Sequence, residues 1–216
     1  MKKYELITED TIGVANSTLY RIRALRDFAD VKAGDLGGYV ESEANLSQIG
    51  DCWLYGRAKA YENAMVWGDA RVEDFACVFG NAEVLGDAKV YDNARIYGNA
   101  KVFGGAQVYD DAALFGDCTV SEQAHVYGDA VISGRASVGY TARVSGNNAI
   151  IWFASVSDRL NILTVYCGRE ELLCSMNGDS ASLRMLSYNH KGRVYELLEE
   201  AARLKLADAQ SKISGK

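Results

Sequence analysis

Few side chains in this sequence could move a proton at neutral pH, because the chain has only two histidines. His125 lies in the segment SEQAHVYG, at a position expected to point outward. There it could take a proton from a hydroxyl or amine of a substrate. His190 lies in SYNHKGR, which is typical of a loop and has no acid or nucleophile beside it. For His125, a surface histidine without a catalytic role is the favoured interpretation.

Carboxylates recur at a spacing that would stack them in a repetitive fold. Asp74, Asp92 and Asp110 are eighteen residues apart, and stacked carboxylates could bind a divalent cation. Aspartates at turns more often accept hydrogen bonds from backbone amides, so the metal is the weaker interpretation. The same spacing aligns a mildly basic line, and a solvated face is favoured there over an anion site: Arg71, Lys89, Gln107, His125 and Arg143.

A six-residue repeat underlies these spacings. Every sixth residue from Leu54 to Val156 is Val, Ile or Leu, except Ala60. Four positions after each of these, as far as Ala154, stands Ala or Cys, with Asn148 as the exception. The consensus is V-Y-G-(N/D)-A-x. A period of six is neither the 3.6 of a helix nor the alternation of an ordinary strand.

Six residues form one short side of a triangular coil. The branched residue points into the prism, and alanine fits its narrow corners. Glycine, asparagine and aspartate supply the positive φ that the corners require. Eighteen residues close a coil and each coil adds ~4.8 Å, which gives a rod of roughly 30 Å. The sequence therefore predicts a mainly β fold, a triangular parallel β-solenoid of about six to seven coils.

With these hexads, the chain resembles the bacterial hexapeptide-repeat proteins that form left-handed parallel β-helices, over about residues 36–156. The resemblance implies left-handed coils. The N-terminal stretch TLYRIRALRDF and, more loosely, the C-terminal stretch ELLEEAARLKL are similar to a narrower group of mostly uncharacterised proteins encoded by phages and prophages. That similarity implies a phage origin more directly than an activity.

The two ends of a solenoid need caps, because open strand edges recruit further strands. Strands are expected over residues 4–7 and 19–28, a hairpin over 161–176 and an amphipathic helix over 194–206. The expected organisation is an N-terminal β cap over residues 1–35, the β-helix over 36–156, a hairpin and helix over 157–209, and a disordered tail over 210–216.

The second residue of each hexad points outward and is often aromatic. Two explanations stay open. Rings one coil apart stack and shield the backbone, or at least one column is a protein interface. Later coils carry Ser or Gly at this position, and we expect the C-terminal segment to fold over them. The candidate binding residues are Tyr61, Phe79, Tyr97 and Phe115 on one face, Tyr91, Tyr109 and Tyr127 on the next, and Trp67 on the third.

The composition narrows the function classes. A net charge of −6 weighs against nucleic acid and against anionic membranes, because binding phosphates requires clustered cations. No apolar run approaches the ~18 residues of a membrane span, and the N-terminus does not resemble a secretion signal. A cytoplasmic location is expected. Five cysteines without a CxxC spacing indicate reduced thiols rather than a disulfide framework or a zinc site.

Two enzyme classes follow from the family resemblance. Hexapeptide acyltransferases act as trimers, with a histidine base in the groove between subunits and a loop extruded from a coil. Only His125 could be that base here, and no loop interrupts the hexads from Leu54 to Val156. The γ-class carbonic anhydrases need three histidine ligands for their metal. The solenoid has one, which excludes that class.

The favoured function is a non-catalytic binding protein, encoded by a phage and acting in the bacterial host cytosol. Its expected partner is a host protein or a small signalling molecule, and inhibition of a bacterial defence system fits that setting. The alternatives are an acyltransferase that uses acyl-CoA and a structural or polymer-forming protein. No cofactor is expected. A homo-oligomer is expected in each case, and the family resemblance favours a trimer.

Overall fold

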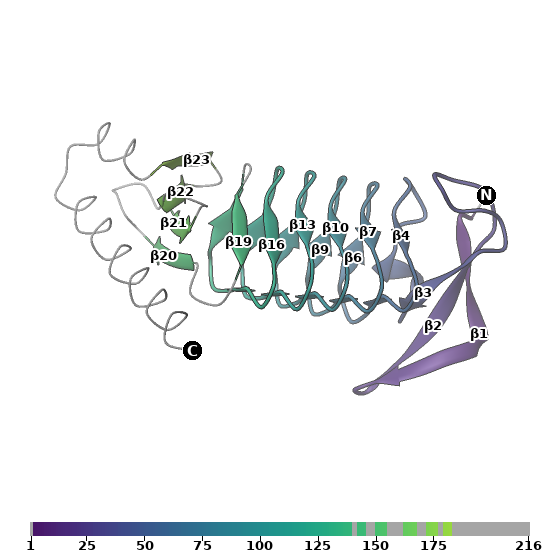
Figure 1. Ribbon diagram of the computed structural model, residues 1–216. Helices are drawn as coiled ribbons and strands as arrows, with labels where there is room; N and C mark the ends of the chain where they lie inside the picture. Colours follow the sequence, from purple (N-terminus) through teal and green to yellow (C-terminus); the bar gives the residue numbers. More distant parts are fainter. Residues whose placement is uncertain are drawn as a thin grey trace.

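The structure is a computed structural model that describes residues 2–139 and 142–145, and the backbone of four strands between residues 150 and 182. Short parallel strands wind around one axis and stack into three sheets that form a triangular prism (Figure 1). The predicted mainly β fold, a parallel solenoid of about six turns, is confirmed. The helix expected over 194–206, His190 and the tail over 210–216 lie outside the described residues.

Each sheet forms one face of the prism. The tyrosine face consists of β4 (Trp53–Leu54), β7 (Arg71–Val72), β10 (Lys89–Val90), β13 (Gln107–Val108), β16 (His125–Tyr127) and β19 (Arg143–Ser145). The hairpin face consists of β3 (Leu36–Val40), β5 (Lys59–Ala60), β8 (Cys77–Val78), β11 (Arg95–Ile96), β14 (Ala113–Leu114) and β17 (Val131–Ile132). The tryptophan face consists of β6 (Met65–Val66), β9 (Glu83–Val84), β12 (Lys101–Val102), β15 (Thr119–Val120) and β18 (Ser137–Val138).

The register between successive coils is eighteen residues from β4 onward, whereas β3 pairs with β5 at an offset of twenty. Val90 lies opposite Val72 on one side and Val108 on the other, both in parallel pairing. Backbone hydrogen bonds run from coil to coil, as from the Lys89 amide to the Ala106 carbonyl at 2.9 Å. The sequence predicted this spacing, because three hexads, one for each side of the triangle, close a coil and place every branched residue on the inside.

The interior is a stack of branched side chains with alanines at the corners. Val90 and Ala94 are fully buried, as are almost all their equivalents along the rod. From Gly56 to Gly134, the corner residue two positions after each inward residue has a positive φ, and it is Gly, Asp or Glu. Asp92 has φ 55° and Gly98 has φ 68°. Aspartate tolerates this conformation better than most residues because its short carboxylate can bond locally.

The N-terminal cap continues the hairpin face. β1 (Tyr4–Val14) and β2 (Ser17–Ala24) form an antiparallel hairpin, and β2 pairs antiparallel with β3. β3 then pairs in parallel with β5, so one sheet passes from hairpin to solenoid. The expected β cap is thus present, with a first strand longer than predicted and a second that ends earlier. A short 3-10 turn follows at η1 (Glu43–Asn45).

Aromatic residues close the prism beneath this cap. Trp53 is 1% exposed and meets the edges of Tyr4 and Phe28, with ring centroids 6.0 and 5.3 Å away. Asn45 is fully buried, and its amide donates to the carbonyls of Glu62 and Ala64, both at 2.9 Å. The Asn45 amide thus donates to backbone carbonyls of the first coil, which has no preceding coil to supply donors.

A separate antiparallel sheet lies at the opposite end of the rod (Figure 1). It contains β20 (Ile150–Ala154), β21 (Ile162–Cys167), β22 (Leu172–Met176) and β23 (Asp179–Ser182). The expected hairpin corresponds to β21 and β22, which pair antiparallel. The hexad pattern extended the solenoid to Val156, but the last parallel strand is β19 and β20 belongs to the antiparallel sheet. Hydrophobic spacing in this segment does not distinguish the two kinds of strand.

Candidate functional site

The tyrosine face carries a stack of phenol rings. Tyr91, Tyr109 and Tyr127 lie one coil apart, with centroid distances of 4.8 and 5.3 Å and ring planes within 9° of parallel. The rings are half-buried, because each covers the flank of its neighbour. Burial raises the pKa of Tyr91 to about 12. The ladder predicted from the eighteen-residue spacing is therefore formed on this face.

A second ladder follows the hairpin face. Tyr61, Phe79, Tyr97 and Phe115 are stacked with centroid distances between 4.9 and 5.1 Å. The β1–β2 hairpin covers its first rings, since Leu19 packs with Tyr61 and leaves that ring only 8% exposed. Much of this column therefore serves to attach the cap to the rod.

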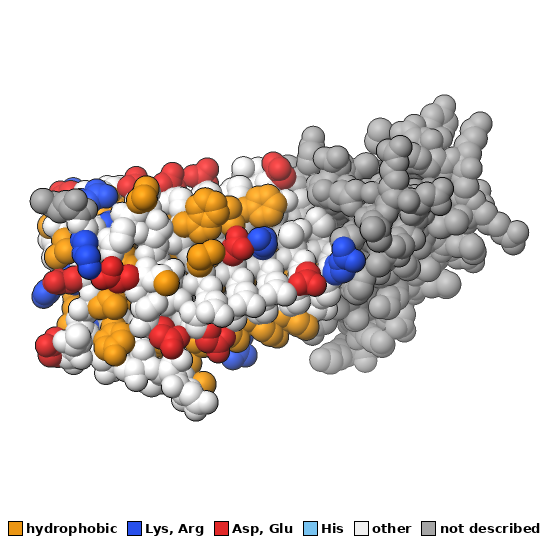
Figure 2. Space-filling view, turned by 180° about the vertical axis from the view of Figure 1, so that it is seen from behind, with side chains coloured by type: hydrophobic (Ala, Val, Ile, Leu, Met, Phe, Trp, Pro, Cys, Tyr) orange, Lys and Arg blue, Asp and Glu red, His pale blue; other side chains and the backbone are white. Residues whose placement is uncertain are grey.

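The outward column of the tryptophan face contains the most exposed aromatic ring of the three columns. Trp67 is 44% exposed and Met65, beside it on β6, is 45% exposed. Leu85 and Phe103 continue the row as half-buried side chains. Apolar side chains gather on this face, with an acidic and a basic side chain next to them (Figure 2). Glu83 and Lys101, paired on neighbouring strands of this face, form an ion pair at 2.8 Å.

The outward residue in a later coil of this same face is buried. Ser121, the next residue in the Trp67 column, is 4% exposed. Strands β21 and β22 lie against β18. These contacts involve the last strand of the face, and the sheet lies at the end of the rod, so folding of the C-terminal segment back over the earlier coils stays a prediction. The open apolar row consequently occupies the coils nearer the N-terminal cap.

His125 stands in the basic line of the tyrosine face, between Gln107 and Arg143 in neighbouring coils. Its ring meets the edge of Tyr109 at a centroid distance of 6.1 Å. Nδ1 is buried and has no hydrogen-bond partner among the described residues. Burial, with a smaller contribution from the charge of Arg143, lowers the pKa of His125. The imidazole is therefore neutral at pH 7 and could accept a proton.

The aspartate column caps the backbone of the rod. A carboxylate oxygen of Asp92 accepts from the Asp110 amide at 3.3 Å, and one of Asp110 accepts from the Gly128 amide at 2.9 Å. Asp74 accepts from the Asp92 amide in the same way, at 3.4 Å. Among the described residues, no group of three or more His, Cys, Asp or Glu side chains is arranged to hold a metal ion. The turn-capping interpretation of these residues agrees with this geometry.

Two features of the cap region were missed in the sequence. Lys3 is fully buried and donates to the Cys52 carbonyl at 2.9 Å and to Cys52 Sγ at 3.2 Å. Asp30 accepts from both terminal nitrogens of Arg71 at 3.1 Å and from the Tyr55 hydroxyl at 2.6 Å. In both contacts the two residues are more than one eighteen-residue coil apart, and one of them lies outside the repeats. The repeat spacing therefore could not predict either contact. Met65 could have been noticed, because other residues at its hexad position are mostly polar or charged.

Comparison with known proteins gives one informative match. No protein-family model matches the chain. The chain is similar to "Uncharacterized acetyltransferase YdcK" of Escherichia coli (strain K12), with 38% identity over 80 residues. The match covers 33% of this chain and 24% of the relative, so the chain spans about a quarter of that protein's length. No helix among the described residues has the length and apolar character required to cross a membrane. The eighteen-residue solenoid and an acetyltransferase relative together fit the hexapeptide-repeat β-helix family.

Proposed function

We propose that this protein is a non-catalytic binding protein whose contact surface is the open part of the tryptophan face. The observation that carries the proposal is the exposure of Trp67 and Met65, at 44% and 45%, next to Leu85 and Phe103. Tryptophan and methionine are enriched in protein interfaces, and tryptophan is among the residues that contribute most to binding energy. Trp67 is far more exposed than Tyr61, which the β1–β2 hairpin leaves only 8% exposed.

The shape of this surface favours a protein as the partner. Small-molecule sites are concave and enclose most of their ligand, whereas a solenoid face is a nearly flat sheet. The strands of the face are held by coil-to-coil hydrogen bonds, such as that from the Met65 amide to the Ala82 carbonyl at 3.0 Å. The surface is thus formed before binding and loses little conformational freedom in the complex. The Glu83–Lys101 pair supplies a polar margin.

The proposed class of partner, a host protein, rests on the resemblance to phage-encoded hexapeptide proteins. A phage protein acting in the host cytosol would meet host proteins, and an inhibitor of a defence system is one such role. A polymer-forming role has less support, because a hairpin adjoins one end of the rod and an antiparallel sheet lies at the other.

A pull-down from bacterial lysate with matched variants tests the proposal. Trp67→Ala removes the central side chain of the surface. Phe75→Ala removes an aromatic ring of similar exposure, 55%, outside this row. We expect a stoichiometric host protein with the parent and with Phe75→Ala, and an affinity for that purified protein at least ~30-fold weaker with Trp67→Ala. Equal affinities of the two variants would contradict the assignment of the face.

A second candidate function is acyl transfer from acyl-CoA. It is supported by the acetyltransferase relative and by the neutral imidazole of His125, whose buried Nδ1 has no partner among the described residues. A general base must be unprotonated at the working pH and within hydrogen-bond reach of its substrate. We would measure coenzyme A release from acetyl-CoA with a panel of amine and hydroxyl acceptors. Activity lost in His125→Ala and kept in His190→Ala would favour this function over binding alone.

A further inference from the structure

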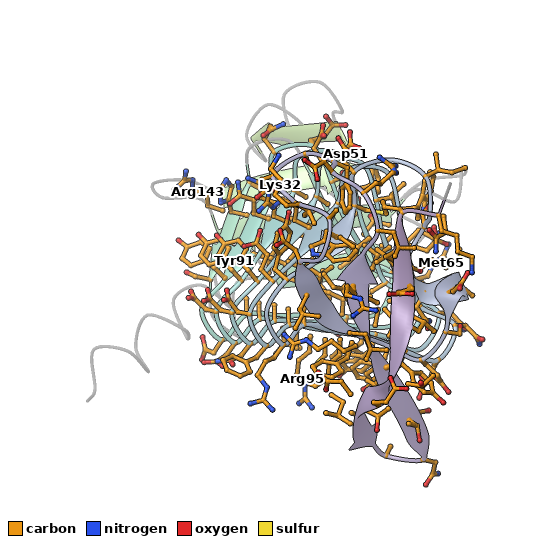
Figure 3. All side chains as sticks on the ribbon, turned by 90° about the vertical axis from the view of Figure 1, so that its right-hand side faces the viewer. Lys32, Asp51, Met65, Tyr91, Arg95 and Arg143 are labelled. Atoms are coloured by element: carbon orange, nitrogen blue, oxygen red, sulfur yellow. The ribbon has the colours of Figure 1, made fainter. Side chains whose placement is uncertain are left out.

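The tyrosine face has basic residues along one margin and acidic residues along the other. A basic line precedes the inward residues, the tyrosine ladder follows them, and an acidic line occupies the next corner. Viewed along the rod, Tyr91 projects from one side of the prism, with Arg143 on the same flank and a column of carboxylates on its other side (Figure 3). The basic line is Arg71, Lys89, Gln107, His125 and Arg143, and the acidic line is Asp74, Asp92 and Asp110.

The parallel register keeps these two lines apart within one molecule. Lys89 stacks on Arg71 in the neighbouring coil, so like charges lie next to each other along the rod. Arg71 is neutralised by Asp30 and Glu73. Lys89 is exposed and forms no ion pair with any described residue. Within the described part of the chain, the carboxylates of Asp92 and Asp110 accept hydrogen bonds only from backbone amides. Lys89 on one margin, and Asp92 and Asp110 on the other, therefore carry opposite charges that form no ion pair with a described residue.

We propose that the tyrosine face binds a second copy of this chain, with the two rods side by side and parallel. A two-fold axis parallel to the rods places the two faces against each other with their margins exchanged. Each residue keeps its position along the rod axis. The basic line of each copy then lies against the acidic line of the other. Lys89 of one copy meets Asp92 at the same height in the other, because both residues belong to one coil.

The alternative two-fold arrangement is electrostatically unfavourable. A two-fold axis in the plane of the interface and perpendicular to the rods makes the rods antiparallel and does not exchange the margins. The basic line of one copy would then lie against the basic line of the other, and the acidic line against the acidic line. Like charges placed opposite each other across an interface cost free energy and reject that arrangement. The direction of the charge pattern therefore selects parallel rods, and the two tyrosine ladders meet in the centre. Tyrosine is among the residues enriched at such positions.

The length of the contact along the tyrosine face determines the expected affinity of the dimer. Five coils at ~4.8 Å give a contact roughly 24 Å long, which is at the low end of specific interfaces. We expect a monomer–dimer equilibrium rather than an obligate dimer, and weaker association at about 0.5 M salt, where the Debye length falls to a few ångströms. The surface is distinct from the tryptophan face, so its failure would leave the proposed binding function untouched.

Sedimentation velocity of charge-exchanged variants tests this interface. We expect Lys89→Glu and Asp92→Lys each to weaken dimerisation by ~10-fold or more, about 1.4 kcal/mol. The double variant Lys89→Glu/Asp92→Lys exchanges both charges in both copies and should restore dimerisation to within about threefold of the parent. Arg95→Glu, an exposed strand residue on the hairpin face, should leave it unchanged.

The double variant separates the interface from misfolding, because a chain that dimerises again must be folded. A parent that stays monomeric at all concentrations would overturn the proposal. So would the trimer expected from the family resemblance, or a double variant that remains as dissociated as the single ones.

Discussion

At the scale of single residues, His125 shows how position sets chemistry in a regular fold. Its outward position follows from the hexad, but its neutral state depends on burial and on Arg143 one coil away. The folded protein lowers the pKa of this imidazole, so the folded state binds its proton less readily than the unfolded chain. The contribution of His125 to stability is present above the ordinary pKa of 6.5 and is lost as pH falls below it.

Titration by NMR checks this arrangement. We expect the His125 resonance to titrate below the ordinary value of 6.5, and Arg143→Gln to shift its pKa upward because a neighbouring positive charge is removed. His190→Gln leaves a single histidine signal and so assigns it. A His125 that titrates at the ordinary value and ignores Arg143→Gln would show that the imidazole is freely solvated.

At the scale of the element, the hexad places alanines both at inward and at outward positions, and we expect the two kinds to respond differently to substitution. Ala100 is fully buried at a corner of the prism. Ala113 lies half-buried at an outward position of β14. Ala100→Leu is expected to destabilise the fold by about 1–3 kcal/mol, because the narrow corner has no room for three more carbons. Ala113→Leu should change the free energy of unfolding by less than about 0.5 kcal/mol. Urea unfolding followed by circular dichroism compares the two, and equal losses would contradict the assigned interior.

The ring ladders give the element a distinct alkaline response. Burial raises the pKa of Tyr61 and of Tyr91 to about 12, whereas a free phenol ionises near 10. The folded state holds these protons longer than the unfolded chain, so the stabilisation is intact below pH 10 and is lost as pH rises through 12. Absorbance at 295 nm should therefore show late-ionising tyrosines whose titration coincides with unfolding. Ionisation of every tyrosine near pH 10 in a folded protein would argue against the ladders.

The same comparison of residues shows what the sequence could predict. Val90, Ala94 and Tyr91 could be placed inside, at the corner and outside because each repeats every eighteen residues. The Lys3–Cys52 and Asp30–Arg71 contacts could not, since each joins an aperiodic cap segment to the first coils. The end of the solenoid was also missed, because Ile150 and Val156 keep the hexad spacing while β20 leaves the rod. Periodicity predicts the shaft, and only tertiary contacts decide its ends.

At the scale of the whole molecule, stability is expected to vary along the rod, since each coil contacts only its neighbours. The bond network of Asp30 holds the cap to the first coils, through Arg71 and Tyr55. Arg71 and Asp30 are 31% and 54% exposed, so the ion pair contributes about 1 kcal/mol at most. Asp30→Ala should raise hydrogen exchange about fivefold in β4 and β7, and leave β14 unchanged.

Asp87→Ala, at an exposed corner outside this network, is the matched control for that measurement. A uniform rise in exchange along the whole rod after Asp30→Ala would mean that the solenoid unfolds as one cooperative unit rather than from its cap.

The eighteen-residue register has a consequence for how such a chain can change length. Insertion or removal of one complete coil preserves every inward residue, every corner and both side-chain ladders, because each residue finds an equivalent neighbour above and below. A change of six or twelve residues keeps the inward residues and corners but moves the ladders to another face, and a change that is not a multiple of six breaks the inward pattern as well. The shaft thus acts as a ruler marked in steps of ~4.8 Å, which sets the separation between the N-terminal hairpin and the C-terminal sheet in whole increments.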